Sequence, residues 1–313
     1  MPGPRSHRRG GDLIAASLRS FWRDGSNVER GGYVVGAVLV ISGLVHLAVL
    51  GTSGGSWYGP VSLRKPMTFG LSFGLTLISI VWVTSFLHLR ARARALLLGV
   101  FTAACALETV LVTVQAWRGV PSHFNLETTF DGLVARTLAG GGFALVAVIV
   151  VLTLTSFRAN AAVPFSLRLA IRIGFVALVG AVIVGALMIA KGMRLVFAGD
   201  PQAAYATGGT LKPIHGAAMH AILVLPALAW ALSFTDWTER ARTRAVLLAT
   251  AGYAAIVGVV GVATLAHIEP EELPLALITT GALGSAILLA TAARRASARQ
   301  PRSRLRAKGR EWR

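Results

Sequence analysis

One carboxylic acid, Glu108, lies within a long run of apolar residues, where an ionisable group is costly. It precedes Trp117, the end of an expected membrane span, by nine residues, which places it about 13 Å deep at a rise of about 1.5 Å per residue. Gln115 is seven residues further on and shares its helical face. A carboxyl group in an apolar environment can hold and deliver a proton. Glu108 is therefore a candidate proton donor or proton carrier, and the alternative is a hydrogen bond between packed helices.

Residues 115–136, which follow Glu108, form the densest polar stretch at the expected outer side of the membrane. His123, Glu127 and Asp131 are spaced by four, so they line one face if Pro121 opens a short helix. Such a face could bind a metal, relay protons or pair with neighbouring arginines. The spacing does not choose among these, because it has no unique metal partner.

The histidines offer a second kind of chemistry. His46 and His220 are expected at similar depths in the first and sixth spans, where they could be the axial ligands of a haem b. His215 precedes His220 by five residues, about 140° around a helix, so the two face different ways. The alternative for each is a hydrogen-bonded packing residue, with no cofactor.

Apolar runs of about 20 residues must position these groups. The 313-residue chain is 54% hydrophobic and 14% charged, against about 25% charged in a soluble domain. Because the backbone in lipid must satisfy its own hydrogen bonds, such runs form helices. The sequence predicts an all-α polytopic membrane protein with eight spans, near 33–50, 67–88, 95–117, 133–156, 172–196, 214–234, 245–267 and 274–293.

The distribution of the 31 Lys and Arg residues predicts the orientation. All but seven fall in the tails and alternate loops, so both termini are expected in the cytoplasm. The net charge of +18 does not indicate nucleic-acid binding, because it lies between membrane spans. No cleavable signal peptide is expected. The excess of Arg over Lys suggests a GC-rich genome such as that of an actinobacterium, and the bacterial cell membrane is the expected location.

The two ends of the chain are expected to remain cytoplasmic. Within the basic segment 1–30, residues 13–23 have the pattern of a short amphipathic helix that lies on the inner membrane surface. The Arg-rich tail 294–313 is expected to be disordered. Cys105 falls in an apolar run and is expected to pack there.

An internal repeat divides the membrane part into halves, 31–157 and 158–293. Four short matches occur in the same order at offsets that drift from 144 to 150 residues. One match pairs Lys65-Pro66 with Lys212-Pro213, and another pairs Trp82 with Trp230. Each half has four helices, so both halves keep one orientation and a site is expected at their interface. The lysines either cap the outer mouth of a central cavity or bind lipid headgroups.

Three segments, WRGVPSHFN (117–125), TTFDG (128–132) and LKPIHGAAMHAILVLPALAW (211–230), resemble a widespread family of bacterial multi-span membrane proteins. In that family an aromatic residue usually follows the first His of the sixth span and a Gln follows the second. Here Gly216 and Ala221 stand there instead, so a ligand role for that stretch does not carry over.

The resemblance implies membrane-bound terpene cyclisation, similar to that of enzymes that cyclise farnesylated indoles. Such a reaction needs an acid in an apolar pocket and aromatic faces for the developing cation. Glu108 is the expected acid, and Asp131, Glu127 or His123 would share proton transfer. A lipophilic substrate is expected to contact Gln115, Trp117, Asn125, Phe69, Phe73, Trp82, Lys65, Lys212, His215 and His220. The rival functions are a haem- or quinone-linked redox protein and a transporter with a polar track centred on Glu108.

Overall fold

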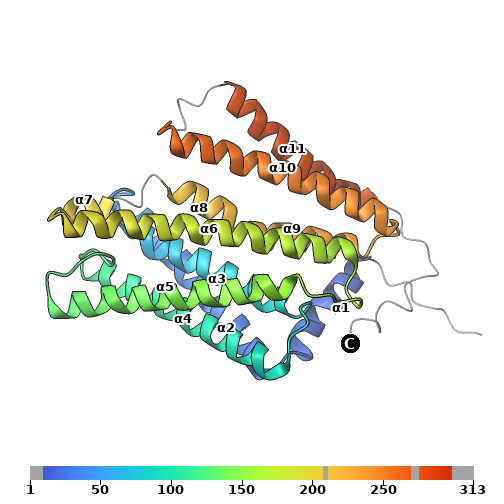
Figure 1. The fold of residues 1–313 in the computed structure, drawn as a ribbon, viewed down its shortest axis with the longest axis horizontal. Coiled ribbons are helices and arrows are strands. Elements are labelled where there is room, and N and C mark those ends of the chain that lie inside the picture. Colours follow the sequence, from blue (N-terminus) through green and yellow to red (C-terminus); the bar gives the residue numbers. More distant parts are fainter. Residues whose placement is uncertain (1–9, 207–210, 269–274, 298–313) are drawn as a thin grey trace, which may run out of the picture.

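The computed structural model describes residues 10–206, 211–268 and 275–297, and the regular elements in these ranges are α-helices (Figure 1). Within them, seven helices are long and apolar enough to cross a membrane, so the chain has the build of a multi-pass membrane protein. They are α2 (Asn27–Ser53), α3 (Arg64–Thr84), α4 (Ala91–Trp117), α5 (Thr129–Ser156), α6 (Phe165–Phe197), the pair α8 (Lys212–Met219) and α9 (Ala221–Leu232), and α10 (Glu239–Leu265).

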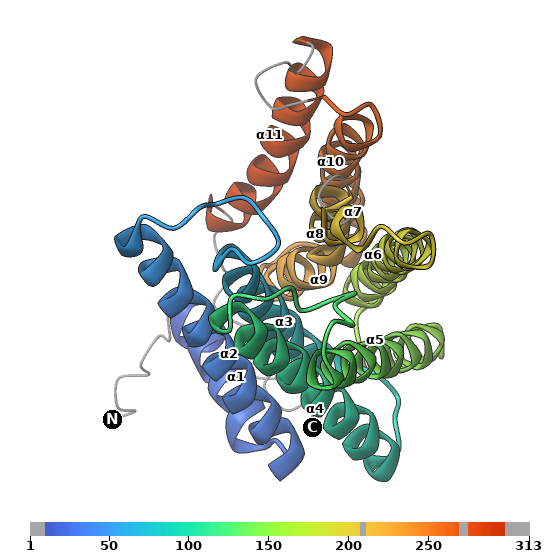
Figure 2. The same ribbon diagram turned by 90° about the vertical axis from the view of Figure 1, so that its left-hand side faces the viewer.

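The eighth expected span, 274–293, coincides with α11 (Leu275–Ser297). The apolar stretch described within this helix, Thr279–Thr291, is shorter than the other seven spans. In Figure 2, α11 and α10 project together from the rest of the bundle. Residues 1–9 and 298–313, which include most of the expected tail, lie outside the described residues.

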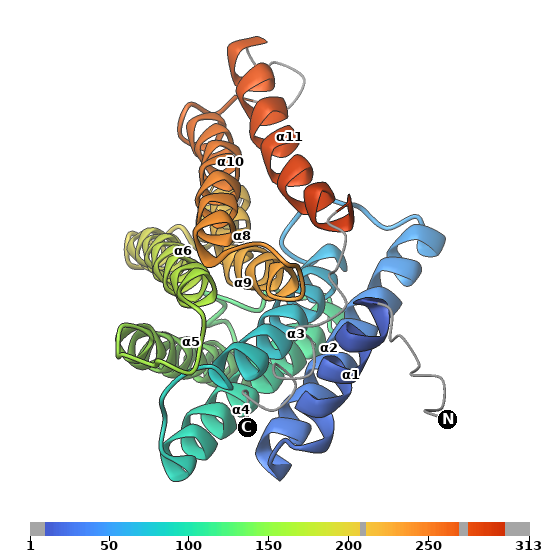
Figure 3. The same ribbon diagram turned by 90° about the vertical axis from the view of Figure 1, so that its right-hand side faces the viewer.

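The spanning helices extend along the length of the molecule and give it two ends. We call the end that holds loop 118–128 and α7 (Pro201–Ala206) the Asp131 end, and it faces the viewer in Figure 2. The opposite, Arg158 end holds α1 (Gly10–Arg23) and faces the viewer in Figure 3. All the candidate catalytic residues lie in the half of the bundle nearer the Asp131 end.

Helix α3 is central, because it packs against α2, α4 and α9. Glycines bring its backbone close to that of α2: a Cβ at Gly70 would lie 2.7 Å from the backbone of Gly43, and one at Gly74 would lie 2.7 Å from that of Gly36. Small residues that permit such close approach are typical of helix packing in membranes.

At the Arg158 end, α3 and α9 meet through two tryptophans. The rings of Trp82 and Trp230 pack edge to face with centroids 5.8 Å apart, and Phe21 of α1 lies against both. Helix α1 is amphipathic as expected, but its apolar side chains divide: Phe21 enters the bundle, whereas Leu18 and Trp22 are exposed. Trp82 is thus part of an aromatic packing cluster, at the end of the bundle away from Glu108.

The expected span 214–234 is interrupted at His220, between α8 and α9. Pro226 lies inside α9, and its ring cannot donate to the carbonyl of Ile222. Proline distorts a helix on its N-terminal side, which accounts for the interruption at His220, two residues before Ile222.

Candidate functional site

Loop 118–128 does not contain the short helix, opened by Pro121, on which a shared face for His123, Glu127 and Asp131 depended. Gly119 and Phe124 adopt positive φ angles of 70° and 66°, which a helix cannot contain. The ring of Phe124 instead presses against Gly192 of α6, where the absence of a side chain leaves room for it. His123, Glu127 and Asp131 therefore do not line one helical face, and each has different surroundings.

Asp131 belongs to a closed hydrogen-bonded network between α4 and α5. Gln115 donates to its Oδ1 at 2.8 Å, and Arg118 donates to the same oxygen at 2.5 Å. Thr128 donates to Oδ2 at 2.6 Å and caps α5 by accepting from the Asp131 backbone. Arg118 also donates to Gln115 and lies over the Phe130 ring. With both carboxylate oxygens occupied, Asp131 holds the loop to the bundle.

His46 is engaged through both of its ring nitrogens. Nδ1 lies 2.7 Å from the carbonyl of Ser42, and Nε2 accepts from Trp117 Nε1 at 3.0 Å. A haem ligand needs one of these nitrogens free, so His46 as placed does not fit the axial pair. His215 is bonded through Nδ1 to the carbonyl of Ala181 on α6, at 2.7 Å. The described residues contain no group of three or more ligating side chains that could hold a metal.

Glu108 lies buried between α4 and α5, with 4% of its surface exposed. A Cβ at Gly141 would lie 2.6 Å from its Oε1, so the missing side chain creates the space for the carboxyl group. That oxygen is buried and makes no hydrogen bond of good geometry within the described residues, although the backbone N–H of Gly142 on α5 lies close to the carboxyl group. A buried carboxyl oxygen without a well-formed hydrogen bond is uncommon, which makes Glu108 a candidate to hold a proton or contact a ligand. Gly141 was not predicted from the sequence, although the run of three glycines at 140–142 was its signal.

His123 turns inward from the loop, towards α3. Its ring lies 5.9 Å from that of Phe69, and Nδ1 lies 3.0 Å from the hydroxyl of Ser122. Burial lowers the pKa of His123 well below its usual value, and the nearby positive charges of Lys65 and Lys212 lower it further. The imidazole is therefore neutral at physiological pH.

The aromatic side chains of α3 connect this histidine with Glu108. Phe69 packs on Phe73, with ring centroids 5.4 Å apart, and on the buried cluster that contains Val112. Val112 lies one turn from Glu108 on α4. Lys65, one turn before Phe69, is close enough to Glu108 for their charges to interact. The structure therefore brings together Glu108, His123 and Lys65, with two phenylalanines beside them.

The other expected site residues lie further from this group. Trp117 is 61% exposed and bonded to His46, and the side chain of Glu127 is exposed. Asn125 is buried: its Oδ1 accepts from the Glu127 backbone, whereas its Nδ2 has no partner in the described structure. His220 is within electrostatic range of His215, at the break between α8 and α9.

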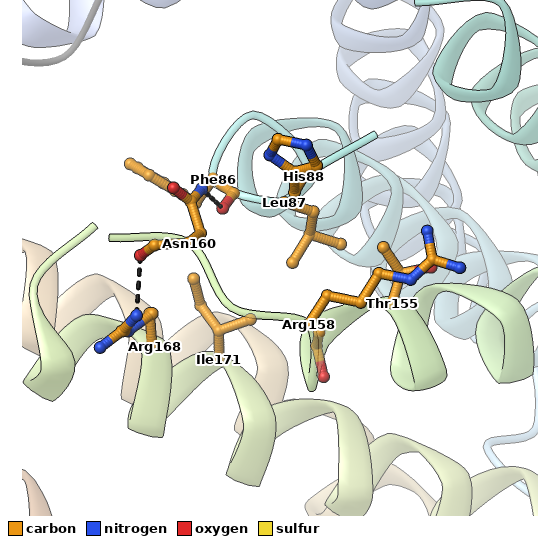
Figure 4. A pocket seen from close by; sticks show the side chains of 9 residues that line it. Phe86, Leu87, His88, Thr155, Arg158, Asn160, Arg168 and Ile171 are labelled. Carbon is orange, nitrogen blue, oxygen red and sulfur yellow. Dashed lines mark hydrogen bonds between the residues drawn. The ribbon is translucent and has the colours of Figure 1, made fainter. Parts of the chain in front are cut away.

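A small pocket with both apolar and polar lining residues lies at the Arg158 end (Figure 4). Asn160 donates to the carbonyl of Phe86 at 2.9 Å, and Arg168 donates to the carbonyl of Asn160 at 2.8 Å. These bonds fasten the α5–α6 connection to the end of α3. The pocket is separated from Glu108 by much of the length of α3 and α5, and its basic residues are Arg158 and Arg168.

The sequence matches no protein-family model, no curated protein and no solved structure. The function is therefore argued from the site itself.

Proposed function

We propose that this chain is a membrane-embedded terpene cyclase that starts the reaction by protonating a lipophilic prenylated substrate from Glu108. The observation that carries the proposal is the buried Oε1 of Glu108, which makes no hydrogen bond of good geometry within the described residues and lies in the space left by Gly141. A general acid for an alkene must be shielded from water, because water would capture the carbocation. The apolar walls of α3, α4 and α5 supply that shielding.

The reaction balances without a cofactor. The Glu108 proton adds to a terminal alkene carbon, and the cation that forms is attacked by a second alkene or by an aromatic ring, which closes a carbon–carbon bond. A proton then leaves the ring cation, so the product is an isomer of the substrate. His123 is the best-placed acceptor for that proton, because its imidazole is neutral and lies beside Phe69.

Two of the expected aromatic residues remain candidates for stabilising the cation. Phe69 and Phe73 follow one face of α3 from the level of His123 towards that of Glu108, and an aromatic face attracts a cation. Trp82 packs in the aromatic cluster at the Arg158 end, and Trp117 donates a hydrogen bond to His46. We therefore give neither tryptophan a part in the chemistry. A farnesylated indole is a suitable probe substrate, because it carries both an alkene chain and an aromatic nucleophile.

Membranes that contain the protein should convert a farnesylated indole into a cyclised product of unchanged mass. We expect Glu108→Gln, which keeps the shape but cannot donate a proton, to lower the rate by about 10²–10⁴-fold. Glu127→Gln changes an exposed carboxylate and should leave the rate near that of the wild type. Full cyclisation by Glu108→Gln would remove the proposed acid.

Gly141→Ala tests the position of the acid without removing it. The new methyl group would displace the Glu108 carboxyl, which is the end of a flexible side chain, so the fold should tolerate it. Gly140→Ala is the matched control, because a Cβ there meets nothing within 4 Å. We expect Gly141→Ala to lose activity at unchanged yield of folded protein, and Gly140→Ala to keep it. Equal activity of the two variants would contradict the geometry.

We further propose eight spans in two repeated halves, with the Asp131 end outside a bacterial cell membrane and both termini in the cytoplasm. Two features support the repeat. The rings of Trp82 and Trp230 each pack on a Phe four residues later, and the backbone carbonyl of each accepts from the hydroxyl of a Ser three residues later. Within each half, successive helices also pack against one another in the same order, α2–α3–α4–α5 in the first half and α6–α8/α9–α10–α11 in the second.

Cysteine labelling tests this topology, because the native Cys105 is fully buried and can be replaced by Ala. Ser56→Cys lies in the exposed α2–α3 loop and Ala159→Cys in the exposed α5–α6 loop. An impermeant thiol reagent should modify the first in intact cells and the second only after permeabilisation. The reverse pattern would invert the orientation.

A further inference from the structure

The group around His123 gathers positive charge without a matching anion. Lys65 and Lys212 are within electrostatic range of each other and of His123. Glu108 is one carboxylate near Lys65, but it lies deeper in the bundle and no ion pair joins them within the described residues. Like charges that face one another in a partly buried site are unfavourable, and an anion bound between them removes the repulsion.

Loop 118–128 holds His123 near these charges at the Asp131 end. The contact of Phe124 with Gly192 fixes it to α6, and the contact of His123 with Phe69 fixes it to α3. Two residues after His123 the loop also holds Asn125, which is fully buried and whose Nδ2 donates to no described atom. A buried amide donor without a partner costs free energy and indicates an absent acceptor.

We propose that Lys65, Lys212 and Asn125 bind the oxyanion head of an amphiphile, a carboxylate or phosphate, beneath loop 118–128. The two ammonium groups supply charge and the amide supplies a directed hydrogen bond, which together suit an acceptor with several oxygens. Lys212 is exposed, so the head can enter from the membrane surface. His123 is neutral and contributes a polar edge without further charge.

A ligand held in this way would extend its apolar chain into the bundle. Phe69 and Phe73 lie one and two turns beyond Lys65 on α3, and Glu108 is about 13 Å from the end of α4. This last step rests on the proposed function, and it extends the candidate substrates from farnesylated indoles to prenylated molecules that carry an acidic group. Binding of the head does not depend on proton transfer by Glu108.

Binding of farnesyl phosphate and of farnesol to the full chain, in nanodiscs of phosphatidylcholine, tests the site. We expect saturable binding of the phosphate and binding of the alcohol weaker by about tenfold or more, because charge-assisted hydrogen bonds are lost. Competition by inorganic phosphate and by phosphatidylglycerol then shows whether the site takes a free oxyanion or a lipid headgroup. Equal affinities for farnesyl phosphate and farnesol would overturn the proposal.

Three variants locate the binding. Lys65→Met and Lys212→Met keep an unbranched chain and should each weaken binding of farnesyl phosphate by about tenfold. Lys191→Met removes an exposed lysine of α6 and should bind as the wild type does. An equal loss in all three would show that only general positive charge matters, and would overturn the site. Glu108→Gln should bind farnesyl phosphate as the wild type does, so a failure of catalysis can be told from a failure of binding. If a Lys variant does not fold, the comparison of farnesyl phosphate with farnesol on the wild type still tests the proposal.

Discussion

Two polar groups at the Asp131 end, supplied in part by the same loop, differ in how completely they are bonded. The closed network of Gln115, Arg118, Thr128 and Asp131 leaves neither oxygen of Asp131 without a donor. The open cluster of Lys65, Lys212, His123, Asn125 and Glu108 contains a buried oxygen and a buried amide nitrogen that make no hydrogen bond of good geometry within the described chain, and two lysines whose charges repel each other.

The difference separates a structural role from a functional one. A fully bonded buried network rigidifies the segment that contains it, and here it ties loop 118–128 to α4 and α5. An incompletely bonded cluster costs stability, and proteins retain such clusters where a ligand or a reaction needs them. Substitutions should therefore destabilise the protein in the closed network, and alter binding or pH dependence in the open cluster.

Asp131→Ala should give the largest effect. It removes both the ion pair with Arg118 and the partner of Thr128 at the start of α5, at an expected cost of about 3 kcal/mol. Thermal unfolding in detergent measures it. Asp236→Ala, an exposed carboxylate at the Arg158 end, is the control and should cost less than about 0.5 kcal/mol. If the two variants unfold alike, the closed network does not support the fold.

Gly192→Ala should act on the loop that the two groups share. The added methyl group collides with the Phe124 ring, and such overpacking should lower the free energy of unfolding by about 2 kcal/mol. Hydrogen exchange should become faster in residues 118–128 and stay unchanged at the Arg158 end. Gly180→Ala lies on the same helix in open space and is the control. Unchanged exchange in Gly192→Ala would mean that Phe124 does not anchor the loop.

His123 should make stability depend on pH. Its pKa is lowered in the folded protein by burial and by the two lysines, whereas in the unfolded chain it is about 6.5. Below about pH 6.5 the unfolded state binds the extra proton, so stability is present above that pH and falls by up to about 1.4 kcal/mol per pH unit beneath it. His123→Asn should flatten the profile between about pH 7.5 and 5.5. If stability falls with pH equally steeply in the wild type and in His123→Asn, the imidazole is exposed to water and not buried.

Lys65→Met should have the smallest effect on stability. The substitution removes a charge that repels Lys212 and introduces an apolar side chain of similar length. The free energy of unfolding should therefore stay within about 1 kcal/mol of that of the wild type, or rise. Thermal unfolding beside Asp131→Ala gives the comparison directly. A loss of stability as large as that caused by Asp131→Ala would show that Lys65 supports the fold, as the closed network does.

Much of the helical arrangement could be predicted from the sequence, because lipid forces long apolar runs into helices. The runs at 95–117 and 133–156 became α4 and α5 with a few more residues at their N-terminal ends. The prediction that Glu108 and Gln115 share a buried face is confirmed, since both are buried. The break at His220 was missed, because Pro226 acts on the turn before it rather than at its own position.

The site was less predictable, because it depends on which segments meet. Spacing suggested one face for His123 and Asp131, but the positive φ of Phe124 sends the first towards α3 and leaves the second at the start of α5. The run of glycines at 140–142 marked a region but not Gly141 itself, and nothing in the sequence marked Gly192, since a glycine shows its role only through the side chain that occupies its space. That Trp117 donates to His46, 71 residues away, was also beyond any local pattern.

The most direct test of Glu108 as the acid is cyclisation of a farnesylated indole in heavy water by wild type, Glu108→Gln, Gly141→Ala and Gly140→Ala. Protonation of an alkene carbon leaves a non-exchanging deuterium, so wild type and Gly140→Ala should give a product one mass unit heavier. Glu108→Gln and Gly141→Ala should form little product of any mass. Unlabelled product from the wild type, or full labelling by Glu108→Gln, would contradict the account.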